Sequence, residues 1–333
     1  MEKQNNTFEE IWNKLKECKK ILMTLHRGPD GDSLGSCAAI KYVLEKEGKE
    51  VKIVSPDDMA ETLQEIEYIK EVEFGKKVAD ENLSEYDCVL FLDVGAEQML
   101  AEKIFDKLKE NNTFVINIDH HKTNSYFGNL NYVEERASTC SVLLKSFKEL
   151  NIKIDKELAE RLLLGICTDT YFFKYRSTAE SLNDAAFLVN KGADYYNKIV
   201  SPILFNQPMR IQKYNAFLIG NMKINLEKRF CYTLLTKEDI KKYELNMAEI
   251  RMSANVISEM REIDFSFTLA DVGDEIKGSL RSQKGVDVSL IAKGLGGGGH
   301  KPASGFVLSN MTLKEAEKKV LDTIEKIGIH KTS

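Results

Sequence analysis

Ile116-Asn117-Ile118-Asp119-His120-His121 is a short apolar run that ends in an acid and two adjacent histidines. Together with Val115, the two isoleucines indicate the end of a buried parallel strand. In open α/β sheets, ligands bind where the carboxyl ends of the strands emerge. We therefore predict that Asp119, His120 and His121 lie at a functional edge of a sheet.

Length and composition describe an ordinary globular chain. Its 333 residues are enough for about two domains, and 43% of them are hydrophobic while 30% are charged. No apolar run approaches the ~20 residues that span a bilayer, and the first residues lack the apolar core of a secretion signal. We therefore expect a cytoplasmic protein with no membrane partner.

The cysteines and the net charge exclude several classes of function. Six cysteines are scattered without a C-x-x-C pair, mostly in apolar stretches, which indicates buried reduced thiols rather than zinc ligands or a disulfide framework. A formal net charge of -5 argues against a protein that coats long nucleic acid. A local basic pocket remains compatible with that charge.

Strands and helices alternate through the first half of the chain. Strands are predicted at residues 20–25, 51–54, 87–93 and 113–118, and helices at 8–19, 34–47 and 97–109. This order predicts an α/β fold with a doubly wound, mainly parallel sheet. Further helices are predicted at 138–150, 155–170, 179–191 and 195–201, with one more ending near residue 221.

Possible metal ligands follow the first predicted strand. His26 ends that strand, and the turn after it carries Asp30 and Asp32. Either Asp32 or Ser33 is predicted to cap the following helix. Pro-Asp-Gly-Asp is also ordinary turn chemistry, but His26 before it favours a metal site.

Two further carboxylates end apolar segments. Asp93 closes a strand, and Asp169 follows the apolar stretch 162–167. A buried carboxylate without a partner is costly, and a metal ion would supply the partner. Alternatively, Asp169 caps the end of a helix or pairs with Lys174 or Arg176.

The last third of the chain has a looser pattern. Strands predicted at residues 230–235, 264–269, 277–282 and 305–308 indicate a smaller α/β domain with a mixed sheet. The glycine run 296–299 with His300 and Lys301 would let backbone N–H groups approach an anion. Glycine runs are also plain linkers, but this run lies between a helix and a strand. We predict domains at 1–190 and 221–333, joined by a helical linker at 191–220.

These motifs together resemble the DHH phosphoesterase family, in its two-domain nanoRNase (NrnA) branch, which is related to RecJ. The likeness covers nearly the whole chain. It rests on six short motifs: residues 26–32, 92–93, 119–121, 168–170, 279–282 and 297–300. The resemblance implies a DHH catalytic domain followed by a DHH-associated substrate-binding domain.

The resemblance also implies a ligand set for two divalent metal ions, for which Mn²⁺ suits the mixed imidazole and carboxylate donors. One ion would be held by His26, Asp30 and Asp93. The other would be held by Asp32, Asp93, His120 and Asp169, so that Asp93 bridges the two.

Catalytic and substrate-binding roles follow in the same way. Asp93, Asp119 and His121 would be catalytic, with Asp119 orienting a ligand histidine and His121 reaching the metals or the scissile phosphate. Substrate phosphate would be gripped by residues of the second domain, namely Arg281, Ser282, Gly297, Gly298, Gly299 and His300.

The implied activity is Mn²⁺-dependent hydrolysis of very short RNA or linear dinucleotides to 5′-mononucleotides, and removal of the 3′-phosphate from 3′-phosphoadenosine 5′-phosphate. A homodimer is left open. The alternatives are a RecJ-like single-strand DNA exonuclease, a cyclic dinucleotide phosphodiesterase, a type II inorganic pyrophosphatase and a non-catalytic RNA-binding module. The filled metal positions disfavour the last of these.

Some positions depart from the family pattern. Related sequences often carry an arginine a few residues after the position of Asp93, whereas residues 94–99 contain none, which makes a substrate preference inferred from relatives less secure than the metal site. Tyr171 stands where many relatives have glycine, and Phe172 and Phe173 follow it. These aromatic residues either line the pocket and stack a base or belong to the core.

Overall fold

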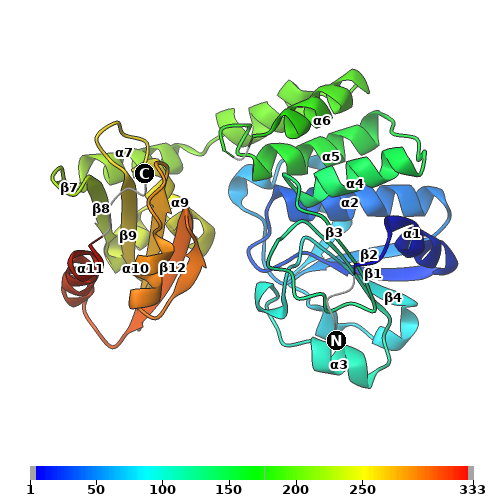
Figure 1. Ribbon diagram of the computed structural model, residues 1–333, viewed down its shortest axis with the longest axis horizontal. Coiled ribbons are helices and arrows are strands. Elements are labelled where there is room, and N and C mark those ends of the chain that lie inside the picture. The colour runs from blue at the N-terminus through cyan, green and yellow to red at the C-terminus, as the bar shows by residue number, and fades with distance from the viewer. Residues whose placement is uncertain (1–4, 176, 329–333) are drawn as a thin grey trace. The chain divides into compact units, whose positions relative to one another are not determined.

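The computed structural model describes residues 5–175 and 177–328, which divide into two compact units between Asn206 and Gln207 (Figure 1). This junction lies within residues 191–220.

Among the described residues, the first unit contains a six-stranded sheet in the order β3-β2-β1-β4-β5-β6. Every neighbouring pair is parallel, so all six strands end at the same edge. The strands are β1 (Lys20–Thr24), β2 (Glu50–Ser55), β3 (Val72–Phe74), β4 (Cys88–Leu92), β5 (Val115–Asp119) and β6 (Leu130–Val133). The predicted parallel sheet is confirmed.

Successive side chains of each strand point to opposite sides of the sheet, and a cluster of buried apolar side chains covers each face. Ile21 and Met23 pack into the larger core cluster, whereas Leu22 packs into the smaller cluster on the other face. The larger cluster is covered by α1 (Phe8–Glu17), α2 (Gly31–Lys46), α4 (Thr139–Glu149), α5 (Lys156–Asp169) and α6 (Ala179–Asn190), and the smaller by α3 (Phe105–Glu110) (Figure 1).

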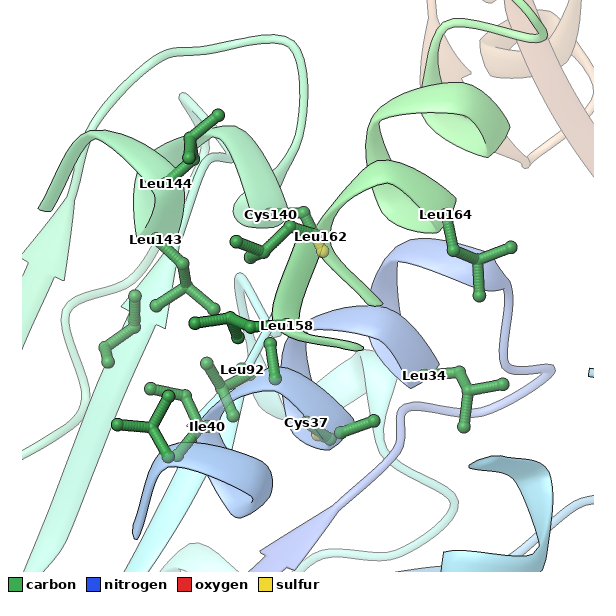
Figure 2. Close-up of a cluster of buried hydrophobic side chains, with 14 of the residues drawn as sticks. Leu34, Cys37, Ile40, Leu92, Cys140, Leu143, Leu144, Leu158, Leu162 and Leu164 are labelled. Carbon is green, nitrogen blue, oxygen red and sulfur yellow. The ribbon is translucent and has the colours of Figure 1, made fainter. Parts of the chain in front are cut away.

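Leucine and isoleucine together make up just over half of the larger cluster. Figure 2 shows Leu34 of α2, Leu143 of α4 and Leu158 of α5 within one buried group that also includes Leu92 of β4. This packing fixes the three helices against the strand ends that carry the acids and histidines.

Three local predictions were wrong. The helix predicted at 97–109 is a 3-10 turn, Glu97–Met99, followed by α3, because Glu97 Oε1 accepts the Ile104 and Phe105 N–H groups at 2.9 and 2.8 Å and starts a new helix there. The cap of α2 is Asp30, not Asp32 or Ser33. Short elements were missed, including β3, β6 and 3-10 turns at Glu61–Leu63, Glu67–Glu71, Val78–Asp80 and Leu83–Glu85.

A π-helix, Tyr196–Phe205, covers the helix that was predicted at 195–201 and ends the first unit. The second unit begins with α7 (Met209–Gly220). Among its described residues, its sheet has six strands in the order β11-β12-β10-β9-β8-β7. They are β7 (Lys223–Asn225), β8 (Phe230–Leu235), β9 (Phe265–Asp271), β10 (Glu275–Ser282), β11 (Gly298–His300) and β12 (Ala303–Ser309).

The second sheet is mixed, as predicted, because β8 and β9 are parallel and every other pair is antiparallel. Its remaining helices are α8 (Lys237–Lys242), α9 (Met247–Val256), α10 (Ser289–Gly294) and α11 (Leu313–Ile327). Part of the glycine run forms β11, an edge strand that the sequence did not predict. Across residues 5–175 and 177–328, no helix is long and apolar enough to cross a membrane.

Candidate metal centre

Three neighbouring strands deliver the first group of polar side chains. His26 lies two residues beyond β1, Asp93 directly follows β4, and Asp119 ends β5. Because β1, β4 and β5 are adjacent and parallel, their carboxyl ends bring these side chains to one edge of the sheet. Asp93 has a φ of +59°, a left-handed conformation that aspartate adopts more readily than most residues.

Helices supply the other carboxylates. Asp30 caps α2, and its Oδ1 accepts the backbone N–H groups of Asp32 and Ser33, both at 3.0 Å. Asp32 is fully buried and accepts the N–H groups of Thr139 at 2.6 Å and Cys140 at 3.0 Å, at the start of α4. The positive end of the α4 dipole therefore stabilises this buried carboxylate.

Imidazole nitrogens lie close to the gathered carboxylates. His26 Nε2 is 3.4 Å from Asp93 Oδ2 and 3.6 Å from Asp30 Oδ2. His120 Nε2 is 3.3 Å from Asp93 Oδ1 and 3.3 Å from Asp169 Oδ2. Each histidine therefore faces two carboxylates, and Asp93 faces both histidines with a different oxygen.

The donor set fits a divalent cation. In each of three groups, possible ligand atoms lie within 4.8 Å of one another: His26, Asp30 and Asp93; Asp32, His120 and Asp169; and Asp93, Asp119, His120 and His121. The other ring nitrogens of His26 and His120 lie 3.1 Å and 3.2 Å from the carbonyl oxygens of Arg27 and Arg136. A proton held there leaves each Nε2 free to bind a metal.

Without a metal, the centre holds protons. Burial, reinforced by the Asp93 carboxylate, raises the pKa of Asp32 to about 7. Burial and the neighbouring acids also raise the pKa of Asp169 well above its usual range. Burial lowers the pKa of His120, but the carboxylates of Asp93, Asp32 and Asp169 outweigh it and raise that pKa to about 11. A bound cation would replace these protons.

The pKa values of Asp93 and His26 shift in opposite directions. Burial disfavours the Asp93 carboxylate, but hydrogen bonds with His120 and His26 outweigh burial and hold its pKa well below the usual range. Burial also disfavours the charged form of His26, yet Asp30 and Asp93 raise the pKa of His26 well above its ordinary value. Asp93 is therefore the ionised carboxylate around which the centre is arranged.

Asp119 and His121 form a hydrogen-bonded pair within this cluster, where His121 Nδ1 also lies 3.7 Å from Asp93 Oδ1. His121 Nδ1 lies 2.7 Å from Oδ1 of the fully buried Asp119, and the His121 side chain is 29% exposed. Burial lowers the pKa of His121, but the hydrogen bond and charge of Asp119 raise it overall. Asp119 thus orients the ring and leaves Nε2 as the other donor.

Asp169 is the last residue of α5, whose C-cap is Thr170. Its Oδ2 faces His120, as described above. Arg176, the partner suggested by one alternative, lies outside the described residues.

Sequence reasoning missed several supporting residues. Asn124, which is fully buried, donates through Nδ2 to Asp119 Oδ2 at 2.6 Å and to Asn117 Oδ1 at 2.8 Å. The Thr139 hydroxyl donates to Asp93 Oδ1 at 3.1 Å. In the sequence these polar residues have the pattern of ordinary loop and helix-cap positions, so no local signal marks them.

Glycines let α5 approach this site. A Cβ on Gly165 of α5 would overlap the Asp32 carboxylate and the Cys140 side chain, and one on Gly31 of α2 would overlap the Thr168 side chain. These contacts require glycine and hold the carboxylate of Asp32 near the end of α5.

The residues predicted to bind substrate lie in the second unit. On the sheet, His300 of β11 and Arg281 of β10 both lie opposite Ala303 of β12, so the two side chains share one row and one face. Ser282 belongs to the opposite face, where it is buried and its hydroxyl donates to Asp264 O at 3.3 Å.

The glycine run has a defined conformation. Gly299 has a φ of +135°, and a Cβ on Gly297 would overlap Gly305 and Phe306, whereas Gly298 faces open space. Burial and the nearby Arg251 lower the pKa of Arg281, whose Nη1 donates to Leu280 O at 2.9 Å. The unit therefore presents an arginine and an exposed histidine beside an open backbone edge.

Two of the three aromatic residues after Asp169 pack against the core. Phe172 and Phe173 are partly buried and pack against the larger core cluster. Tyr171 is 40% exposed.

A parallel sheet that gathers imidazoles and carboxylates at one edge has the donor set of a metal-dependent phosphoesterase. Residues 20–166 match the DHH family N-terminal domain, and residues 227–327 match the DHHA1 domain. The chain therefore carries a DHH family N-terminal domain followed by a DHHA1 domain, which confirms the resemblance seen in its motifs.

Relatives and a solved structure extend this match. The chain is 29% identical to the bifunctional oligoribonuclease and PAP phosphatase NrnA of Thermus thermophilus, over 91% of this chain and 89% of that protein. It is 26% identical to the cyclic-di-AMP phosphodiesterase PdeA of Listeria monocytogenes, over 92% of this chain but 47% of that protein. An exopolyphosphatase-related protein from Bacteroides fragilis has a TM-score of 0.86 at 25% identity, over 96% of this chain and 95% of that one.

Proposed function

We propose that this protein is a two-metal, Mn²⁺-dependent phosphoesterase that hydrolyses short oligoribonucleotides and linear dinucleotides to 5′-mononucleotides. We propose that it also removes the 3′-phosphate from 3′-phosphoadenosine 5′-phosphate. The observation that carries the proposal is the position of the Asp93 carboxylate. Its Oδ2 lies 3.4 Å from His26 Nε2, and its Oδ1 lies 3.3 Å from His120 Nε2. A relative that is aligned over most of both chains and named for both activities supports the substrates.

The proposed ligands divide into two sets that share Asp93. His26 and Asp30 complete one set, and Asp32, His120 and Asp169 complete the other. When bound, two such ions activate a water molecule and neutralise charge on the phosphate. Mixed imidazole and carboxylate donors suit Mn²⁺.

Asp119 and His121 are proposed to supply a proton to the reaction. Asp119 holds Nδ1 of His121 and favours the protonated ring. We propose that His121 donates its Nε2 proton to the leaving oxygen as the P–O bond breaks, or contacts the scissile phosphate directly. The hydroxyl of Thr139 keeps Asp93 in place.

In the second unit, Arg281 and His300 with the backbone of Gly298 and Gly299 are proposed to bind a further phosphate of the substrate. Ser282 was also predicted to contact substrate. Its buried hydroxyl is bonded within its own unit, so we propose that it shapes the strand that carries Arg281.

Cellular location and assembly also remain proposals. All six cysteines are buried and unpaired, which supports a reducing compartment such as the cytoplasm. Dimerisation stays a prediction.

Cleavage of cyclic dinucleotides is the second candidate, because a relative is named for that activity. This chain spans about half the length of that relative, and the same centre would attack either a cyclic or a linear phosphodiester. Degradation of long single-stranded DNA is disfavoured by the net charge of -5.

A Mn²⁺-supplemented time course tests the proposal. The substrates are a 5′-labelled RNA dinucleotide, 3′-phosphoadenosine 5′-phosphate, a cyclic dinucleotide and long single-stranded DNA, each offered separately. We expect rapid loss of the first two and little attack on the long DNA. Degradation of the DNA alone would contradict the proposed substrate class while leaving the metal centre in place.

A further inference from the structure

Three consecutive aromatic residues form a strained turn directly after α5. Tyr171, Phe172 and Phe173 have φ values of 49°, 57° and 63°, which is the left-handed region that side chains disfavour. Two backbone bonds tie the turn to the end of α5: Tyr171 N donates to Thr168 O at 3.0 Å and Phe172 N to Cys167 O at 2.6 Å. Strain of this kind persists only where the surrounding structure enforces it, and it is concentrated at functional sites.

The three rings of the turn lie in two different environments. Phe172 and Phe173 pack against the larger core cluster, and this packing accounts for them. Tyr171 is 40% exposed, so core packing does not explain its ring. The turn therefore presents a single large ring to solvent.

A second ring supports Tyr171. The Tyr171 and Tyr175 rings are stacked, with centroids 5.4 Å apart and an interplanar angle of 29°. Lys174 Nζ lies 6.0 Å from the Tyr171 centroid and 5.6 Å from the Tyr175 centroid. A stacked pair whose outer ring is exposed, with a positive charge beside it, suits an aromatic ligand that carries phosphate.

Chain geometry places this pair beside the candidate metal centre. Consecutive Cα atoms are about 3.8 Å apart, so the Cα atom of Tyr171 lies within about 7.6 Å of that of Asp169. Asp169 in turn faces His120 at 3.3 Å. A nucleotide whose phosphate occupies the metal centre would have its base in the neighbourhood of Tyr171.

We propose that Tyr171, supported by Tyr175, is a stacking platform for the nucleobase of the nucleotide whose phosphate is held at the metal centre. This inference rests on the proposed function and names the part of the substrate that the first unit recognises. Every base has a stacking face, so the platform recognises a nucleotide without selecting a particular base. Tyr171 is thereby a specificity-determining residue that separates nucleotides from other phosphate esters.

Binding to the Mn²⁺-loaded full chain tests the platform without relying on turnover. The probes are adenosine 5′-monophosphate and ribose 5-phosphate, in which a hydroxyl group replaces the base. The variants are Tyr171→Leu and Tyr171→Phe. We expect the wild type and Tyr171→Phe to bind the nucleotide about tenfold more tightly than the sugar phosphate. Tyr171→Leu should lose that preference and still bind ribose 5-phosphate like the wild type.

The wild type and both variants carry a non-glycine residue at position 171. A loss of stability caused by the strained turn should therefore be the same in Tyr171→Leu and Tyr171→Phe. An equal preference for the base in Tyr171→Leu and the wild type would overturn the platform. Hydrolysis of the RNA dinucleotide is measured alongside. If the wild type fails to cleave it but shows the Tyr171-dependent preference, the proposed function is wrong and the platform stands.

Discussion

Asp93 Oδ1 lies 3.3 Å from His120 Nε2, although the two residues follow different strands of the sheet. The other oxygen of Asp93 lies 3.4 Å from His26 Nε2, so one carboxylate connects both histidines. The proposed bridging role predicts that Asp93→Asn lowers Mn²⁺-dependent hydrolysis by more than about a hundredfold. Asparagine tolerates the left-handed φ of this position, so the variant should fold.

Metal content and turnover are measured together for Asp93→Asn. Asp106→Asn serves as the control, because Asp106 is an exposed residue of α3. Near-normal turnover in Asp93→Asn would rule out the bridge.

The protonation of the metal-free centre predicts a pH-dependent stability. The pKa of His120 is raised to about 11 and that of His26 is also raised. The stability that these two protonated histidines contribute is therefore fully present below about pH 6.5, and it is lost as the pH rises toward their pKa values in the folded protein. Each group contributes up to about 1.4 kcal/mol per pH unit. The melting temperature of chelator-treated protein should therefore fall from pH 6.5 to pH 9.

Bound Mn²⁺ should suppress that fall, because a metal ion takes the place of the protons. Comparing metal-loaded and metal-free protein at each pH removes effects common to the rest of the chain. Parallel losses in the two forms would show that the pH dependence arises elsewhere.

Asn124 is predicted to be essential for the Asp119–His121 pair. Asn124→Ala leaves Asp119 Oδ2 buried without its 2.6 Å donor, which should cost about 1–3 kcal/mol in the free energy of unfolding. The freed carboxylate should hold His121 less well and lower kcat by about tenfold to a hundredfold. Urea unfolding and turnover check both effects, with Asn82→Ala as an exposed control.

Close packing at Gly165 should be as important as the ligands themselves. A methyl group there would overlap the Asp32 carboxylate and Cys140, so Gly165→Ala should destabilise the first unit by about 1–3 kcal/mol and weaken Mn²⁺ binding. Gly220→Ala is the matched helical control, since a Cβ at that position meets no atom within 4 Å. Tight Mn²⁺ binding in Gly165→Ala would contradict the packing argument.

Arg281→Ala should raise KM more than it lowers kcat, because the proposed role of Arg281 is to bind substrate phosphate. Arg281→Lys should recover only part of the affinity, since lysine lacks the two-pronged donor geometry of arginine. Steady-state kinetics on the RNA dinucleotide measure both constants, and bound metal should be unchanged. A loss confined to kcat would assign Arg281 to the chemical step instead.

Local pattern was sufficient to predict the parallel sheet of the first unit, although it missed two of the six strands, β3 and β6. Apolar runs of about five residues that alternate with amphipathic segments require a covered parallel sheet, and acids or histidines directly after those runs must lie at one edge. His26, Asp93 and Asp119 followed from that rule, and the family motifs gave the full ligand set and its expected roles. Helices with clear apolar spacing and caps, such as α4 after Ser138, were placed equally well.

Contacts between distant segments were decided only by tertiary packing. The approach of Asp32 to the start of α4 and the packing of Gly165 against Cys140 join segments that lie far apart in the chain. The support of Asp119 by Asn124 depends on the fold of a short loop whose sequence has no distinguishing pattern. The break of the predicted 97–109 helix depended likewise on one Glu97 side chain reaching Ile104 and Phe105. Periodicity reports which face of an element is buried, whereas the partner of a polar atom depends on which elements pack beside it.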